Sequence, residues 1–198
     1  MVRKQSDLIK NMKDTEVLVH LYLTQAIILV LAGIMGYFLF EDLHAFQQIW
    51  KWDIKEILLY GGGSAIIVII IDYTLMKFVP KNMYDDGGIN EKVFQQRPVW
   101  SIFIISLVVA FTEEIFFRGV IQTHFGYITA SIIFAILHIR YLYKWLLFTI
   151  VVGLSFFIGW IYIVTNNLWV TIFAHFLIDF VFALIIRIQY LRDVSISR

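Results

Sequence analysis

The stretch Thr112-Glu113-Glu114-Ile115-Phe116-Phe117-Arg118 decides how this chain folds. It lies inside an apolar run from Trp100 to Ile121, and nothing charged stands between Arg97 and Glu113. A charged side chain in the hydrocarbon of a bilayer costs at least about 2.5–3.5 kcal/mol, so such residues usually face a bundle interior and mark a functional site. We therefore expect a membrane helix whose charged side chains face the interior of the protein and belong to a functional site.

Helical spacing separates these charges. Glu114 and Arg118 are one turn apart and can pair, whereas Glu113 is rotated by about 100°. The pair could be purely structural, because structural ion pairs also occupy bundle interiors. The sequence predicts that the partner of Glu113 comes from elsewhere in the chain.

The composition is that of a membrane protein. The 198 residues are 60% hydrophobic and 16% charged, with a mean hydropathy of +0.79, whereas a soluble domain is about 45–50% apolar. The net charge of +1 argues against a nucleic-acid partner. The absence of cysteine excludes disulfides, thiolate metal sites and a cysteine nucleophile.

Apolar stretches predict an all-α polytopic membrane protein with about six transmembrane helices. They are Val17–Phe40, Ile57–Val79, Trp100–Ile121, Tyr127–Ile139, Leu142–Thr165 and Leu168–Gln189. The fourth is only marginally long enough to cross. We divide the chain into an N-terminal part with two helices (1–97), a core of four apolar helices that contains the charged stretch (98–190) and a polar tail (191–198).

Charge distribution predicts the orientation in the cell membrane. Six spans put both termini on one side, and thirteen of the sixteen Lys and Arg residues then share that side. Because Lys and Arg accumulate in cytoplasmic loops, we expect cytoplasmic termini. Glu113 would lie about 20 Å from the cytoplasmic start of its span, nearer the outer face.

Two further patterns occur in the later spans. Phe134 and His138 are one turn apart near the end of the fourth stretch, and His175 and Asp179 are one turn apart in the sixth. Each alone has a simple explanation: an intramembrane His often bonds across helices, and Asp179 could fix one tautomer of His175. Together with Glu113, these groups exceed what packing needs, because each costs free energy to bury.

The order Glu-Glu-x-x-x-Arg, Phe-x-x-x-His, His-x-x-x-Asp resembles the CPBP intramembrane proteases. This family contains the type II CAAX prenyl endopeptidases and the bacterial Abi, bacteriocin-processing and self-immunity proteins. The resemblance covers roughly residues 99–182. The matching positions are Glu113, Glu114, Arg118, Phe134, His138, His175 and Asp179. The segment Gly153-Leu-Ser155-Phe-Phe-Ile-Gly159 resembles a weaker Gly-rich motif, whose role would be close packing.

The resemblance implies hydrolysis of a peptide bond in a membrane-associated peptide or protein. Glu113 would act as general base on a water held between it and His138, and Glu114 would be fixed by Arg118. His175 with Asp179 would stabilise the oxyanion. The family often has Asn at the last motif position, and an ionised Asp cannot donate a hydrogen bond. Asp179 would then be protonated, or would hold His175 as the donor.

The sequence leaves the metal open. A zinc ion would take Glu113, His138 and His175 as ligands, since three protein ligands plus water is the usual catalytic arrangement. The family is commonly labelled a metalloprotease, yet its prenyl-protease branch looks able to use the Glu/His pair alone, so we expect no obligatory cofactor. The sequence has neither a His-Glu-x-x-His nor a Gly-x-Ser-x-Gly signature.

Two other functions compete with proteolysis. The first is a non-catalytic immunity protein that binds a bacteriocin or its receptor and retains the protease scaffold. The second is a proton-coupled transporter with Glu113, Asp72 and the histidines as a relay, although the chain lacks the inverted repeats of such proteins. Asp72, inside the second span, would alternatively be a buried partner for a Tyr or His on a neighbouring helix.

Overall fold

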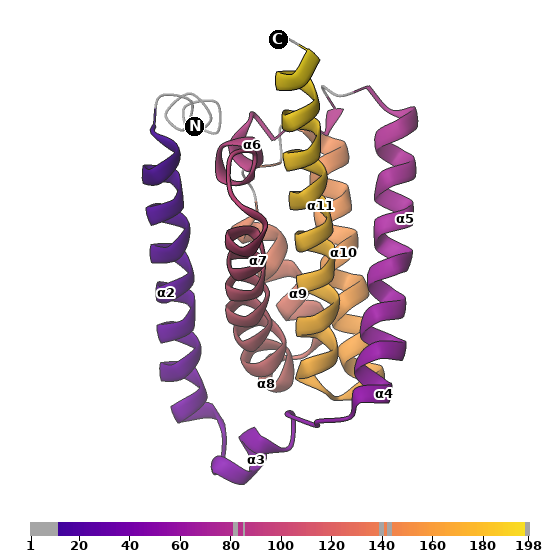
Figure 1. Cartoon of the computed structure of the whole chain (residues 1–198). Coiled ribbons are helices and arrows are strands. Elements are labelled where there is room, and N and C mark those ends of the chain that lie inside the picture. The colour runs from indigo at the N-terminus through magenta and orange to yellow at the C-terminus, as the bar shows by residue number, and fades with distance from the viewer. Residues whose placement is uncertain (1–11, 81–82, 85, 139–140, 142–143, 197–198) are drawn as a thin grey trace.

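The computed structural model describes residues 12–80, 83–84, 86–138, 141 and 144–196, and its regular structure in these ranges is entirely helical. Five helices are long and apolar enough to cross a membrane, which confirms the all-α polytopic architecture of an integral membrane protein (Figure 1). They are α2 (Asp14–Leu39); α4, η1 and α5 (Ile54–Glu56, Ile57–Gly62, Gly63–Phe78); α7, η3 and α8 (Val99–Glu114, Ile115–Gln122, Thr123–Phe125); α10 (Trp145–Thr165); and α11 (Leu168–Ile196).

The fourth apolar stretch forms a shorter helix, α9 (Tyr127–Leu137), of 11 residues. Such a helix is about 16 Å long, roughly half the hydrocarbon thickness, so it does not cross the membrane by itself. Residue Ile139, the expected end of this span, lies outside the described residues. The start of α2 and the end of α11 still lie at the same end of the bundle (Figure 1). The last helix also continues through most of the segment predicted as a polar tail.

Polar residues at the connections determine where the helices begin and end. Asp42 caps α3 (Leu43–Gln47), Asp53 caps α4, and Asp86 accepts hydrogen bonds from the first backbone N–H groups of α6 (Ile89–Phe94). Asn166 ends α10 in the left-handed conformation, and Asn167 then caps α11. Side-chain oxygens at these positions satisfy helix N–H groups that have no intrahelical partner.

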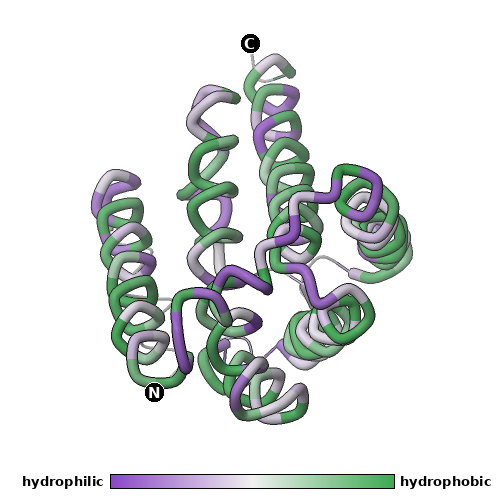
Figure 2. The backbone as a smooth tube through the Cα atoms, turned by 90° about the horizontal axis from the view of Figure 1, so that it is seen from below, coloured by the Kyte–Doolittle hydropathy of each residue, from purple (hydrophilic) through white to green (hydrophobic). Residues whose placement is uncertain are grey.

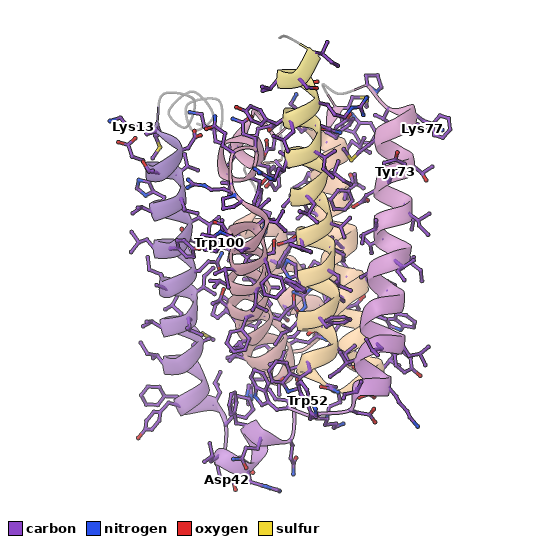
Figure 3. The ribbon with its side chains drawn as sticks, in the orientation of Figure 1. Lys13, Asp42, Trp52, Tyr73, Lys77 and Trp100 are labelled. Carbon is purple, nitrogen blue, oxygen red and sulfur yellow. The ribbon has the colours of Figure 1, made fainter. Side chains whose placement is uncertain are left out.

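The helices form one bundle with α7 and α11 packed together at its centre (Figure 1). The α2 helix packs against α7 and η3, α5 packs against α11, and α10 packs against α9 and α11. Apolar residues run along the helices and hydrophilic residues gather in the connections (Figure 2). Lys13 and Lys77 lie at one end of the bundle, with Asp42 and Trp52 at the other (Figure 3).

Glycine allows two of the close helix contacts. A Cβ atom on Gly61 would lie 2.8 Å from the carbonyl oxygen of Val170 in α11. A Cβ atom on Gly159 would lie 2.9 Å from the Tyr127 ring of α9. Both contacts agree with the close packing expected of small residues in membrane helices.

Two tryptophans in the connection between α2 and α4 lie in different environments. Trp52 is 70% exposed at the end of the bundle (Figure 3), as an interfacial anchor would be. Trp50 instead packs edge-on against Trp169 of α11 and contacts Phe111 of α7. The segment between α2 and α4 therefore contributes Trp50 to the core between α7 and α11.

Candidate active site

The centre of the site is a buried carboxylate that joins two helices. Glu114 is fully buried at the end of α7, and its Oε1 atom accepts a hydrogen bond from Arg118 Nη1 at 3.0 Å. The same oxygen lies 2.9 Å from Nδ1 of His175 on α11. Because the oxygen already accepts from Arg118 and the pair needs one donor, His175 Nδ1 carries the proton. The predicted Glu114–Arg118 pair is present, and His175 contacts the same carboxylate oxygen.

Arg118 connects this centre to α10. Its Nη2 atom donates to the carbonyl oxygen of Ser155 at 3.0 Å, and its side chain is 2% exposed. Arg118 belongs to η3, a π-helical turn, and such turns are frequent at functional sites. Ser155 is buried, as a packing residue should be, and in addition its backbone holds the guanidinium.

Asp179 lies beside His175 at the more accessible side of the site. Its Oδ2 atom is 3.5 Å from His175 Nε2, and its side chain is 33% exposed. The carboxylate in hydrogen-bond contact with His175 is therefore Glu114, on the other ring nitrogen. One of the two roles expected for Asp179 was to hold the imidazole, and in this structure Glu114 contacts the ring from the other side as well.

Glu113 has a partner on α2. Its Oε1 atom accepts a hydrogen bond from Gln25 Nε2 at 3.1 Å, and Gln25 Oε1 in turn accepts from the hydroxyl of Thr112. This partner comes from elsewhere in the chain, as predicted, but its identity was missed. The signal was present, because Gln25 is a polar residue in a long apolar span.

His138 is connected to the site through Phe134. The two rings stack with centroids 4.3 Å apart, and the Arg118 guanidinium carbon lies 5.3 Å from the centre of the Phe134 ring. His138 Nδ1 lies 2.9 Å from the carbonyl oxygen of Phe134. A carbonyl only accepts, so Nδ1 donates, and in the neutral ring Nε2 is the acceptor.

The three residues that would bind a zinc ion, Glu113, His138 and His175, do not form a metal site in the described part of the chain. Within the described ranges, no three His, Cys, Asp or Glu side chains lie close enough together to hold a metal ion. Glu113, His138 and His175 therefore do not fit a shared tetrahedral site in this arrangement, whose ligand distances would be about 2.0–2.2 Å.

Asp72 lies apart from these residues. It lines a pocket of about 310 Å³ between α5 and α10, whose other walls are apolar and include Val68, Gly153 and Phe157. Among the described side chains, no Tyr or His hydrogen-bonds to Asp72, so the expected buried partner is not present. The residues lining the pocket include none of the six predicted site residues.

Comparison with known proteins agrees with the motifs. The family model described as type II CAAX prenyl endopeptidase Rce1-like matches residues 95–181. This range includes the six residues predicted to form the site, Glu113, Glu114, Arg118, His138, His175 and Asp179. Uncharacterized protein YpbD from Bacillus subtilis (strain 168) is 48% identical over 170 residues, covering 86% of this chain and 90% of that protein. No solved structure gives a significant match. The predicted resemblance is confirmed: the chain belongs to the Rce1-like family of type II CAAX prenyl endopeptidases.

Proposed function

We propose that this protein is an intramembrane endopeptidase that hydrolyses a peptide bond in a membrane-associated peptide or protein. The observation that carries the proposal is the buried Glu114–Arg118–His175 centre, with Glu113 next to it on the same helix. Each of these groups costs free energy to bury. Membership of the Rce1-like family supports the same reaction class.

Glu113 is the general base in this proposal. Glu113 is 9% exposed. A water molecule that reaches its carboxylate therefore has few other solvent molecules to compete with it for that carboxylate. Glu113 takes a proton from that water, and the water oxygen attacks the scissile carbonyl carbon. The carboxylic acid then returns the proton to the leaving amine nitrogen, which restores the carboxylate. A positioned base of this kind contributes about 10²–10⁴-fold to a rate.

His175 stabilises the charge that develops on the carbonyl oxygen. Glu114 holds its Nδ1–H, so the Nε2 edge is directed toward Asp179 and the accessible side of the site. When both nitrogens are protonated, Nε2–H can donate to the oxyanion while Nδ1–H stays on Glu114. One such donor contributes about 2.7–4 kcal/mol. Glu114 and Arg118 are positioning residues in this scheme.

The remaining roles concern the environment. His138 is held by Phe134 at the edge of the site and contacts the water or the substrate backbone. In this proposal the protein lies in the cell membrane with both termini in the cytoplasm. The end of the bundle with Lys13 and Lys77 (Figure 3) would then face the cytoplasm. The substrate is reached within the bilayer or at its surface, and the reaction needs no obligatory cofactor.

A reconstitution experiment tests the proposal. Wild-type protein and the Glu113→Gln variant are placed in liposomes with a panel of membrane-anchored peptides, some with a transmembrane helix and others with a lipid anchor. New peptide termini are identified by mass spectrometry. We expect cleavage of at least one peptide by the wild type and none by a variant with the same thermal unfolding curve.

Two results would overturn the proposal. If the wild type cleaves no peptide but both proteins retain one equally well, the protein is a binding protein of the immunity type. If Glu113→Gln cleaves as fast as the wild type, the base has been assigned to the wrong residue.

A further inference from the structure

Gln25 occupies an unusual position on α2. The residues of this helix that are buried or belong to the hydrophobic clusters lie along one helical stripe: Val17, Leu18, Leu21, Gln25, Ile28, Ala32, Met35 and Leu39. The other members are apolar, and Gln25 is 6% exposed. Its neighbour Thr24 faces outward, and its hydroxyl donates to the carbonyl oxygen of His20 on the same helix. A polar amide in a buried stripe of a membrane helix is costly unless it is hydrogen-bonded.

The hydrogen bonds of Gln25 give its amide a direction. The oxygen accepts from the Thr112 hydroxyl, and the nitrogen donates to Glu113 Oε1 at 3.1 Å. The reversed amide would place two acceptor oxygens together unless Glu113 were protonated. The observed arrangement is therefore the one that suits an ionised carboxylate, and it occupies one of the two Glu113 oxygens.

The α2 helix is attached on both sides of Gln25, which keeps the amide at a fixed distance from α7. On the N-terminal side, Lys92 Nζ donates to the carbonyl oxygen of Met12 and Arg97 donates to that of Asp14. On the C-terminal side, Ala32 is 2% exposed in the cluster that contains Phe116. These contacts hold the Gln25 face of α2 against the core.

We propose that Gln25 is a positioning residue for Glu113, so that α2, outside the residues matched by the family model, completes the site. Its donated hydrogen bond fixes the Glu113 carboxylate and leaves the second oxygen to accept the proton of water. Thr112 acts through Gln25, because its hydroxyl holds the amide oxygen and so keeps the amide nitrogen directed at Glu113. This inference rests on the proposed peptidase function and adds a residue to it.

The experiment uses the full-length protein in liposomes and a peptide that the wild type cleaves in the panel described above. The variants are Gln25→Leu, Thr112→Val and their combination, with Thr112→Ser as the conservative replacement and Thr24→Val as the control from the outward face of α2. For each, kcat, KM and the thermal unfolding midpoint are measured. Leucine suits the apolar stripe, so Gln25→Leu is expected to fold.

A hydrogen bond to a charged group is worth about 10- to 100-fold in rate when the bonded group is the base. We expect Gln25→Leu to lower kcat by about that factor, with KM changed less than about twofold. Thr112→Val lowers kcat less, Thr112→Ser recovers most of that loss, and the double variant is no slower than Gln25→Leu. Thr24→Val behaves like the wild type.

Several outcomes would overturn the inference while leaving the peptidase function intact. These are a wild-type kcat in Gln25→Leu, a change in KM alone, rate losses that follow losses in unfolding midpoint, or fully additive effects of the two substitutions. If the wild-type protein cleaves no peptide, it is the proposed function that fails, and the positioning role fails with it.

Discussion

Arg118 and Glu114 form an ion pair 3.0 Å long in which both side chains are almost completely buried. Arg118 also donates to the carbonyl oxygen of Ser155, so a single guanidinium connects η3, the end of α7 and the middle of α10. Arginine suits this role because its planar fork directs several donors at once, which the point charge of lysine does not.

Replacing Arg118 with lysine should separate charge from geometry. The ammonium can still pair with Glu114 but cannot also reach Ser155, so we expect about 1.5–3 kcal/mol lower stability and slower cleavage. Arg192→Lys, at an exposed position near the end of α11, is the control. Thermal unfolding in detergent measures the effect, and an unchanged midpoint in Arg118→Lys would mean that the fork is not needed.

Phe134 should matter through its ring. It contacts the Arg118 guanidinium on η3 and stacks with His138, two contacts that leucine cannot reproduce. We expect Phe134→Leu to lower stability by about 1–2 kcal/mol, from the lost cation–π and aromatic contacts, and to slow cleavage. The matched control on α9 is Ile136→Leu, because Ile136 is 58% exposed. Equal unfolding midpoints for the two variants would contradict this role.

The contact of η1 with α11 gives a test of the fold with two glycines that are two residues apart, Gly61 in η1 and Gly63 at the start of α5. Gly61→Ala places a methyl group 2.8 Å from the Val170 carbonyl oxygen, whereas Gly63→Ala meets nothing within 4 Å. Overpacking costs about 1–3 kcal/mol, while an unobstructed Gly→Ala change in a helix gains up to about 1 kcal/mol. The unfolding midpoint should therefore fall for Gly61→Ala and stay level or rise for Gly63→Ala. The reverse order would show that Gly61 of η1 does not pack against Val170 of α11.

Metal removal tests the expectation that no cofactor is obligatory. Cleavage should survive exhaustive treatment of the reconstituted protein with a zinc chelator, and adding zinc ions afterwards should not raise the rate. The measurement is the initial rate of cleavage before and after chelation. A loss that zinc restores would establish a metal site in an arrangement of Glu113, His138 and His175 different from the one described.

Some of this site could be predicted because it depends on spacing within one helix. Residues four apart share a helix face, so the Glu114–Arg118 pair and the neighbourhood of His175 and Asp179 followed from the sequence. Apolar run lengths likewise predicted the five long membrane helices, but they also predicted a sixth span where α9 is too short to cross. The family motifs placed these residues on three helices of one core.

Contacts between distant segments could not be read in the same way. The bond from Gln25 to Glu113 joins residues 88 apart in the chain, and it depends on which face of α2 packs against α7. The sequence also could not say that Glu114 would contact His175 at Nδ1, in addition to Asp179 at Nε2. The contacts of His175 depend on the position of α11 along α7. The helical pattern of each helix alone does not determine that position.

The rate of a single turnover by Glu113→Gln tests the central claim most directly. Glutamine keeps the shape of Glu113 but cannot take a proton from water, so with enzyme in excess over a cleavable membrane-anchored peptide the rate should fall by at least about 100-fold. Thermal unfolding should match that of the wild type. A folded Glu113→Gln protein that cleaves within about tenfold of the wild-type rate would contradict water activation by Glu113.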